Sequence, residues 1–110
     1  MYPVKVRSHA DIADAVGHAL EHGSLLLSEA DLSPEFFDLR SGLAGELMQK
    51  FVNFRIKLAI VITDPQSHGE RFSELAYEHR SHPLVRFFSA EPQAQAWLDD
   101  AINHREAPGR

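Results

Sequence analysis

Three polar residues that could bind an anion or a charged partner lie together near the start of a predicted helix. Asp38, Arg40 and Ser41 fall within one short stretch of the chain. The guanidinium of arginine fits carboxylate and phosphate groups, and the first backbone N–H groups of a helix are free to receive them. The other interpretation is structural: Arg40 pairs with Asp38, Glu35 or Glu46 and holds the loop against the sheet. The residues alone leave both interpretations open.

Glu46 is a further candidate for binding or chemistry. It precedes Lys50 by four residues, with the acid first, which is the favourable order for an ion pair on a helix surface. A solvated pair of this kind explains both residues. A catalytic couple would require both side chains to face a cleft, which the spacing does not establish.

Asp64 is the last candidate and follows a predicted buried strand. Open α/β sheets bind their ligands at the carboxyl ends of the strands, so Asp64 could line a small pocket with Thr63 and residues 67–69. The alternative is turn chemistry, in which Asp64-Pro65 ends the strand and a serine caps the next helix.

The histidines invite a metal hypothesis that their spacing does not support. Asp14, His18 and His22 lie along one helical stripe, and His79 and His82 form a second close pair. A metal site requires three or four ligands and supporting hydrogen bonds. We therefore expect no metal ion and no other cofactor, and interpret these residues as part of a polar outer face.

Motifs for common enzyme chemistry are missing from the sequence. There is no phosphate-binding G-x-x-x-x-G-K-[ST] loop, no dinucleotide-binding G-x-G-x-x-G and no G-x-S-x-G nucleophile elbow. The chain has no cysteine, which excludes disulfides and thiolate catalysis. The sequence favours a protein without catalytic activity and supplies no catalytic residue.

Charge and hydropathy limit the partners and the compartment. The formal net charge of −5 argues against nucleic-acid binding, which relies on lysine and arginine. No apolar run approaches the ~20 residues that span a bilayer, and the N-terminal residues contain no signal-peptide segment. We expect a soluble, cytoplasmic protein that binds neither nucleic acid nor membrane.

The candidate residues must be positioned by alternating strands and helices. Alternation or continuous apolar runs predict strands at 4–7, 24–28, 55–63 and 84–88, and helical spacing predicts helices that begin near Ser8, Ser33, Ser67 and Ser89. The order βαβαβαβα implies right-handed crossovers. We predict a single layered α/β domain over residues 1–104, with a mainly parallel four-stranded sheet packed with helices, and a flexible C-terminal tail over residues 105–110.

The second predicted helix contains an irregularity at Arg40. Its apolar residues fall in one broad sector, namely Phe36, Phe37, Leu43, Ala44, Leu47, Met48 and Phe51. An unbroken helix would place Arg40 inside that sector. Gly42 and Gly45 each weaken a helix by ~1 kcal/mol relative to alanine, so the helical phase could instead be lost between Arg40 and Gly42.

The segment FFDLRSGLAGELMQKFVNFRIKLAIV, residues 36–61, resembles the signature of an uncharacterised bacterial family catalogued as domain of unknown function 4180. The resemblance continues through LVRFF to the last helix and implies no established activity. At fold level the chain looks like a STAS domain, the module of sulphate transporters and anti-sigma-factor antagonists. Asp38, Ser41 and Gly42 are comparable to the motif that opens its helix, although two residues separate the acid from the hydroxyl, so the resemblance does not extend to phosphorylation.

These observations lead to two functional hypotheses. The first is a STAS-like protein-interaction and regulatory module without catalytic activity, which binds an unidentified protein partner through Asp38, Arg40 and Ser41. The alternative is a small anionic ligand-binding protein or modest enzyme with a pocket at the C-terminal ends of the strands, using Asp38, Arg40, Glu46 and Asp64. A closed polar cavity would favour the ligand, whereas a flat apolar patch beside Arg40 would favour a partner. A homodimer is compatible with the sequence but is not specified by it.

Overall fold

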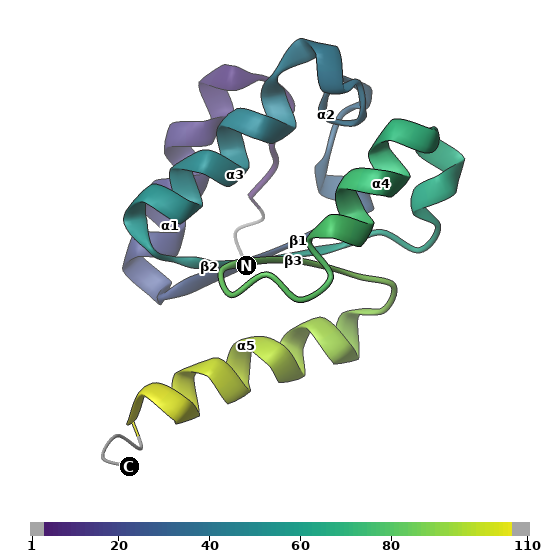
Figure 1. The fold of residues 1–110 in the computed structure, drawn as a ribbon. Helices are drawn as coiled ribbons and strands as arrows, with labels where there is room; N and C mark the ends of the chain where they lie inside the picture. Colours follow the sequence, from purple (N-terminus) through teal and green to yellow (C-terminus); the bar gives the residue numbers. More distant parts are fainter. Residues whose placement is uncertain (1–3, 107–110) are drawn as a thin grey trace.

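The computed structural model describes residues 4–106, which fold around a sheet of three parallel strands in the order β1-β2-β3 (Figure 1). The elements are α1 Ile12–His22, β1 Ser24–Ser28, α2 Pro34–Phe37, α3 Leu43–Phe54, β2 Lys57–Val61, α4 Glu70–Glu78, β3 Val85–Phe88 and α5 Glu91–Glu106, with short 3₁₀ helices η1 His9–Asp11, η2 Glu29–Asp31, η3 Leu39–Ser41 and η4 Pro65–His68. The strands are in parallel register, with Leu25 opposite Leu58 and Leu58 opposite Val85. The chain therefore has the predicted α/β class.

The helices cover the two faces of the sheet unequally. Figure 1 shows α1 to α4 on one side of the strands and α5 alone on the other. Successive strand residues point to opposite faces, so one large core forms beneath α1, α3 and α4, and a smaller one forms beneath α5. In β2 the residues Leu58, Ala59 and Ile60 are all fully buried. The prediction of an interior strand at this position is confirmed.

The predicted fourth strand near the N-terminus is wrong for the described residues. Val6 donates its N–H to the carbonyl of Asp31 at 2.9 Å and makes only an isolated parallel bridge with Leu32. Because η1 begins at His9, the chain turns away before a ladder can extend. The sheet has three strands within residues 4–106, and a four-stranded STAS-like layout is not observed.

The predicted second helix is broken into α2, η3 and α3. Gly42 ends η3 and precedes α3 with φ of 80°, a left-handed conformation that glycine adopts without steric cost. Helical phase is thus lost between Arg40 and Gly42, which confirms the second interpretation of the Arg40 irregularity. The break lets α3 bury Leu43, Leu47 and Phe51 completely while Arg40 stays outside the core.

The other element ends agree with the sequence-based expectations only in part. Gly23 closes α1 in a left-handed conformation, as predicted. The third helix does not start at Ser67, because η4 occupies residues 65–68 and α4 begins only after Gly69. Helix α5 includes the first two residues of the predicted tail, and residues 107–110 lie outside the described part of the chain.

Among the described residues, no helix has both the length and the apolar content needed to cross a bilayer.

Candidate functional site

An open groove lies beside Arg40, at the end of the sheet where β1 and β2 finish. Its cavity volume is about 510 Å³. One wall comes from the end of α2 and from η3, and the other from η4 and the start of α4. The lining residues are Phe37, Asp38, Leu39, Arg40, His68, Gly69, Glu70, Arg71 and Phe72. We call this hollow the Arg40 groove.

Asp38 shapes the first wall by capping η3. Its Oδ1 accepts the backbone N–H of Arg40 at 3.1 Å and the Arg40 Nε–H at 3.4 Å. The structure thus selects Asp38 as the partner of Arg40, in place of Glu35 or Glu46. The Arg40 side chain is 89% exposed, and exposed ion pairs are worth only about 0–1 kcal/mol. The guanidinium can therefore exchange Asp38 for an external acid at little cost.

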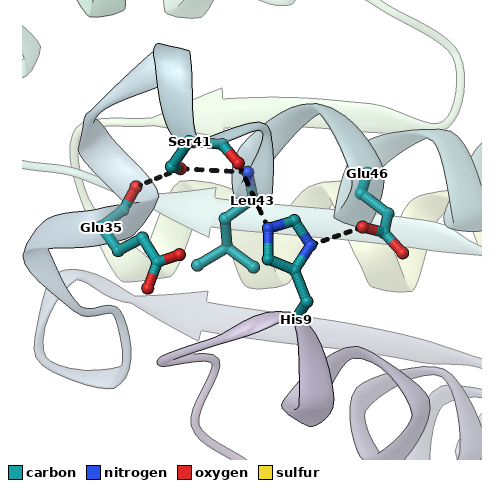
Figure 2. Close-up of polar contacts among 5 residues, drawn as sticks. All are labelled: His9, Glu35, Ser41, Leu43 and Glu46. Atoms are coloured by element: carbon teal, nitrogen blue, oxygen red, sulfur yellow. Dashed lines mark hydrogen bonds and ion pairs between the residues drawn. The ribbon is translucent and has the colours of Figure 1, made fainter.

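Ser41 lies outside the groove and joins the helices around it. Its hydroxyl donates to the carbonyl oxygen of Glu35 at 2.8 Å and accepts the N–H of Leu43 at 3.1 Å (Figure 2). These two bonds tie the first turn of α2 to the start of α3 across η3. Ser41 therefore acts as a structural link, and its hydroxyl is engaged in both directions.

Glu46 pairs with an N-terminal histidine that the sequence reasoning missed. Its Oε1 lies 2.5 Å from Nδ1 of His9, while Nε2 of His9 lies 3.2 Å from the carbonyl oxygen of Ser41 (Figure 2). The predicted Glu46–Lys50 pair is absent from the ion pairs of the described residues. The hydrogen bond that the Glu46 carboxylate accepts from His9, followed by the one that the Ser41 carbonyl accepts, raises the pKa of His9 above its ordinary value of 6.5.

His68 and Glu29 form a second pair that the sequence did not reveal. Nε2 of His68 lies 2.5 Å from Oε2 of Glu29, which joins the segment after β2 to the segment after β1. The imidazole also stacks on Phe37, with ring centroids 3.7 Å apart and an interplanar angle of 7°. Phe72 meets both rings edge-on. The two walls of the Arg40 groove are thereby held together by an aromatic cluster at its base.

The second wall offers unsatisfied polar groups. Arg71 and Glu70 make no side-chain hydrogen bond or ion pair with the side chains that the structure describes, residues 4–99. The first N–H groups of α4 have no intrahelical acceptor, and no side chain caps them. The groove thus combines aromatic surface with charges of both signs.

Asp64 belongs to a separate hollow at the ends of β2 and β3. This cavity of about 360 Å³ is lined partly by Asp64, Tyr77 and Phe88. Asp64 caps η4 by accepting the N–H of Gln66 at 3.2 Å, and its carbonyl accepts the hydroxyl of Ser67 at 2.7 Å. These bonds match the part of the turn interpretation that concerns Asp64, whereas Ser67 lies inside η4 and does not cap the next helix, α4. The five predicted site residues therefore fall in three places, and only Asp38 and Arg40 share the groove.

His22 and His82 make hydrogen bonds within their own segments of the chain. Nδ1 of His22 bonds to the carbonyl of His18 at 2.9 Å. Nδ1 of His82 accepts the N–H groups of Leu84 and Val85, and burial, followed by the charges of neighbouring groups, lowers the pKa of His82. No group of three or more potential metal ligands occurs among the described residues.

Comparisons with known proteins give one result for this chain. No curated protein and no solved structure is similar enough to count as a match. A family model described as a domain of unknown function, DUF4180, matches residues 3–98. That range contains the whole Arg40 groove, the sheet and most of the helical layers. Since the match covers far more than half of the sequence, the chain belongs to the DUF4180 family.

Proposed function

We propose that the protein is a non-enzymatic interaction module that binds a partner protein through the Arg40 groove. The observation that carries this proposal is the position of Arg40, which is 89% exposed in a groove that is also lined by the half-buried ring of Phe37. Arginine and aromatic residues are enriched where protein interfaces gain most of their binding energy. The regulatory role expected of a STAS-like module would follow from partner binding.

The chemistry of the groove defines what the partner presents. An acidic side chain would replace Asp38 as the acceptor for the Arg40 guanidinium, in a charge-assisted hydrogen bond that strengthens as the interface excludes water. An apolar side chain would cover the half-buried ring of Phe37. A small ligand is normally enclosed over most of its surface, whereas this groove is open. A protein segment is large enough to cover the open side of the groove, which favours a protein partner.

Phosphorylation of Ser41 is not part of this proposal. Its hydroxyl joins Glu35 to Leu43, so a phosphoryl group there would break the link between α2 and α3. The acid and hydroxyl of the STAS-like motif also do different work, because Asp38 caps η3 while Ser41 bridges the helices. Partner exchange at Arg40 is the simpler basis for regulation.

Affinity purification of the full chain from its native cell tests the proposal. The Arg40→Ala variant removes the groove cation, and Lys50→Ala removes an exposed cation on α3 as the matched control. Loss of a central interface arginine costs more than about 1 kcal/mol, so we expect Arg40→Ala to reduce recovery of a specific partner roughly tenfold. Lys50→Ala should leave recovery unchanged. Equal recovery by the folded Arg40→Ala variant would remove the Arg40 groove as the binding surface.

A small anionic ligand is the second candidate occupant of the same groove. The cavity volume of about 510 Å³ lies within the usual range for ligand sites, and the guanidinium of Arg71 adds a second cation to that of Arg40. A ligand at 100 times its dissociation constant adds ~2.7 kcal/mol to stability, which a thermal-shift screen of metabolite anions detects. A shift that disappears in Arg71→Ala would support this candidate, and an empty screen would count against it.

A further inference from the structure

Both ring nitrogens of His9 face oxygen atoms that accept hydrogen bonds. Nδ1 lies 2.5 Å from the carboxylate Oε1 of Glu46, and Nε2 lies 3.2 Å from the carbonyl oxygen of Ser41 (Figure 2). A neutral imidazole carries a single N–H, so it can donate to one of these acceptors and must turn a lone pair toward the other. Only the doubly protonated ring donates to both. The surroundings of His9 are therefore arranged for imidazolium.

We propose that His9 is a proton-binding site that clamps the N-terminal segment to the junction of η3 and α3, and that release of its proton loosens the Arg40 wall of the groove. The two acceptors lie on different elements, since Ser41 ends η3 and Glu46 lies in α3. Loss of the proton removes one of the two bonds that His9 donates. The link from the clamp to partner binding rests on the function proposed for the groove, whereas the clamp itself does not.

A short chain of contacts connects His9 to the groove. His9 bonds to the carbonyl oxygen of Ser41, and Ser41 is the residue after Arg40 in the same turn of η3. The ring also lies against Gly42, because a β-carbon built there would be 4.0 Å from Cε1 of His9. The clamp thus acts on the residues that set the direction of η3. Only Ser41 separates His9 from Arg40 along this path of contacts.

The charged groups around His9 favour the proton. Glu46 faces the ring from α3 and Glu35 from α2, and both raise the pKa of His9. On its own segment Arg7 and Asp11 lie 3.7 Å apart and pair with each other. The side chains of His9 and Glu46 are each 44% exposed, so solvent protons reach the ring. The clamp is closed at low pH and opens as the pH rises through the raised pKa.

An NMR pH titration of the full chain tests the clamp without any partner. We expect the imidazole signals of His9 to titrate with a midpoint above 6.5 and to show protons on both nitrogens below that midpoint. Glu46→Gln should lower the midpoint toward 6.5, whereas Glu74→Gln, which removes an exposed acid on α4, should not. A His9 midpoint at or below 6.5, or one that Glu46→Gln leaves in place, would overturn the proposal.

Transmission to the groove is read in the same titration. The backbone amide of Ser41 and the Nε–H signal of Arg40 should shift with the midpoint of His9, and both shifts should vanish in His9→Gln. If these signals stay constant while His9 titrates, the coupling to the groove is wrong. Failure of the partner-binding proposal is separate, because it shows as unchanged partner recovery by Arg40→Ala and leaves these midpoints as they are.

Discussion

Replacing Gly42 and Gly45 by alanine, one at a time, should change the free energy of unfolding in opposite directions. The two glycines lie three positions apart and are both exposed. Gly42 has φ of 80° between η3 and α3, whereas Gly45 lies within α3. The comparison therefore isolates backbone conformation from side-chain packing. It also tests the break that places Arg40 beside the groove.

The magnitude follows from the two backbone conformations. An alanine at position 42 would meet only Cε1 of His9, at 4.0 Å, so its cost is the left-handed backbone, about 1–2 kcal/mol. Reduced freedom of the unfolded chain returns about 0.4–1 kcal/mol, which leaves a net loss near 1 kcal/mol. At position 45 nothing lies within 4 Å of the new β-carbon, and the better helix former gains about 0.5–1 kcal/mol. The two variants should differ by roughly 1–2 kcal/mol.

Urea unfolding measures this difference directly. The single tryptophan, Trp97, lies in α5 against Lys57 and Arg86 and reports loss of tertiary structure, while circular dichroism reports the helices. Equal slopes with denaturant would show that only stability has changed. Gly17→Ala, in α1 with nothing within 4 Å of the new β-carbon, is the control and should stabilise the protein as Gly45→Ala does.

A stabilising Gly42→Ala variant would refute the reasoning. If residues 34–54 formed one continuous helix, position 42 would be an ordinary helical site and alanine would improve it. Arg40 would then point into the apolar sector, and the Arg40 groove would lose its first wall. A gain in stability at both positions would therefore contradict the fold of this segment and the proposed function with it.

Three further outcomes follow from the same contacts. Phe36→Ala removes a fully buried ring and should cost about 3–5 kcal/mol in a chemical-unfolding measurement. Asp31→Ala removes the acceptor for both the N–H and the hydroxyl of Ser28 and should cost about 1 kcal/mol, visible as a lower melting temperature with an unchanged circular dichroism spectrum. Because the pKa of His9 is raised in the folded state, the His9–Glu46 pair stabilises the protein below pH 6.5, and this contribution is lost as the pH rises through the raised pKa. Urea unfolding from about pH 5 to about pH 9 should show this decline in the wild type and a flatter dependence in Glu46→Gln.

The sequence predicts the elements whose apolar pattern is local. The helix that Gly23 ends, the interior strand at residues 57–61 and the buried face of α3 all follow from periodicity and caps within a few residues. The prediction of a fourth strand was wrong because β pairing depends on a partner elsewhere in the chain, which a local pattern does not reveal. Val6 has the right pattern but meets only Leu32, so no ladder forms.

The candidate site divides in the same way. The residues of the Asp38–Arg40 pair are separated by two positions, so local spacing is sufficient to predict this pairing as one of the alternatives. His9 lies 37 positions from Glu46, and His68 lies 39 positions from Glu29. No short-range pattern connects residues at such distances. The second wall of the groove and the clamp at His9 therefore required the three-dimensional arrangement.

The thin layer beneath α5 has a consequence for sequence change. Ala59 of β2 and Ala94 of α5 are both fully buried and pack in one cluster with Leu98. Each of these alanines contributes a single methyl group to the contact, and completely buried positions have little space for added atoms. A larger residue at either position must lift the helix, since overfilled interiors cannot absorb extra volume. The short distance between α5 and the sheet on this side therefore depends on the small size of Ala59 and Ala94.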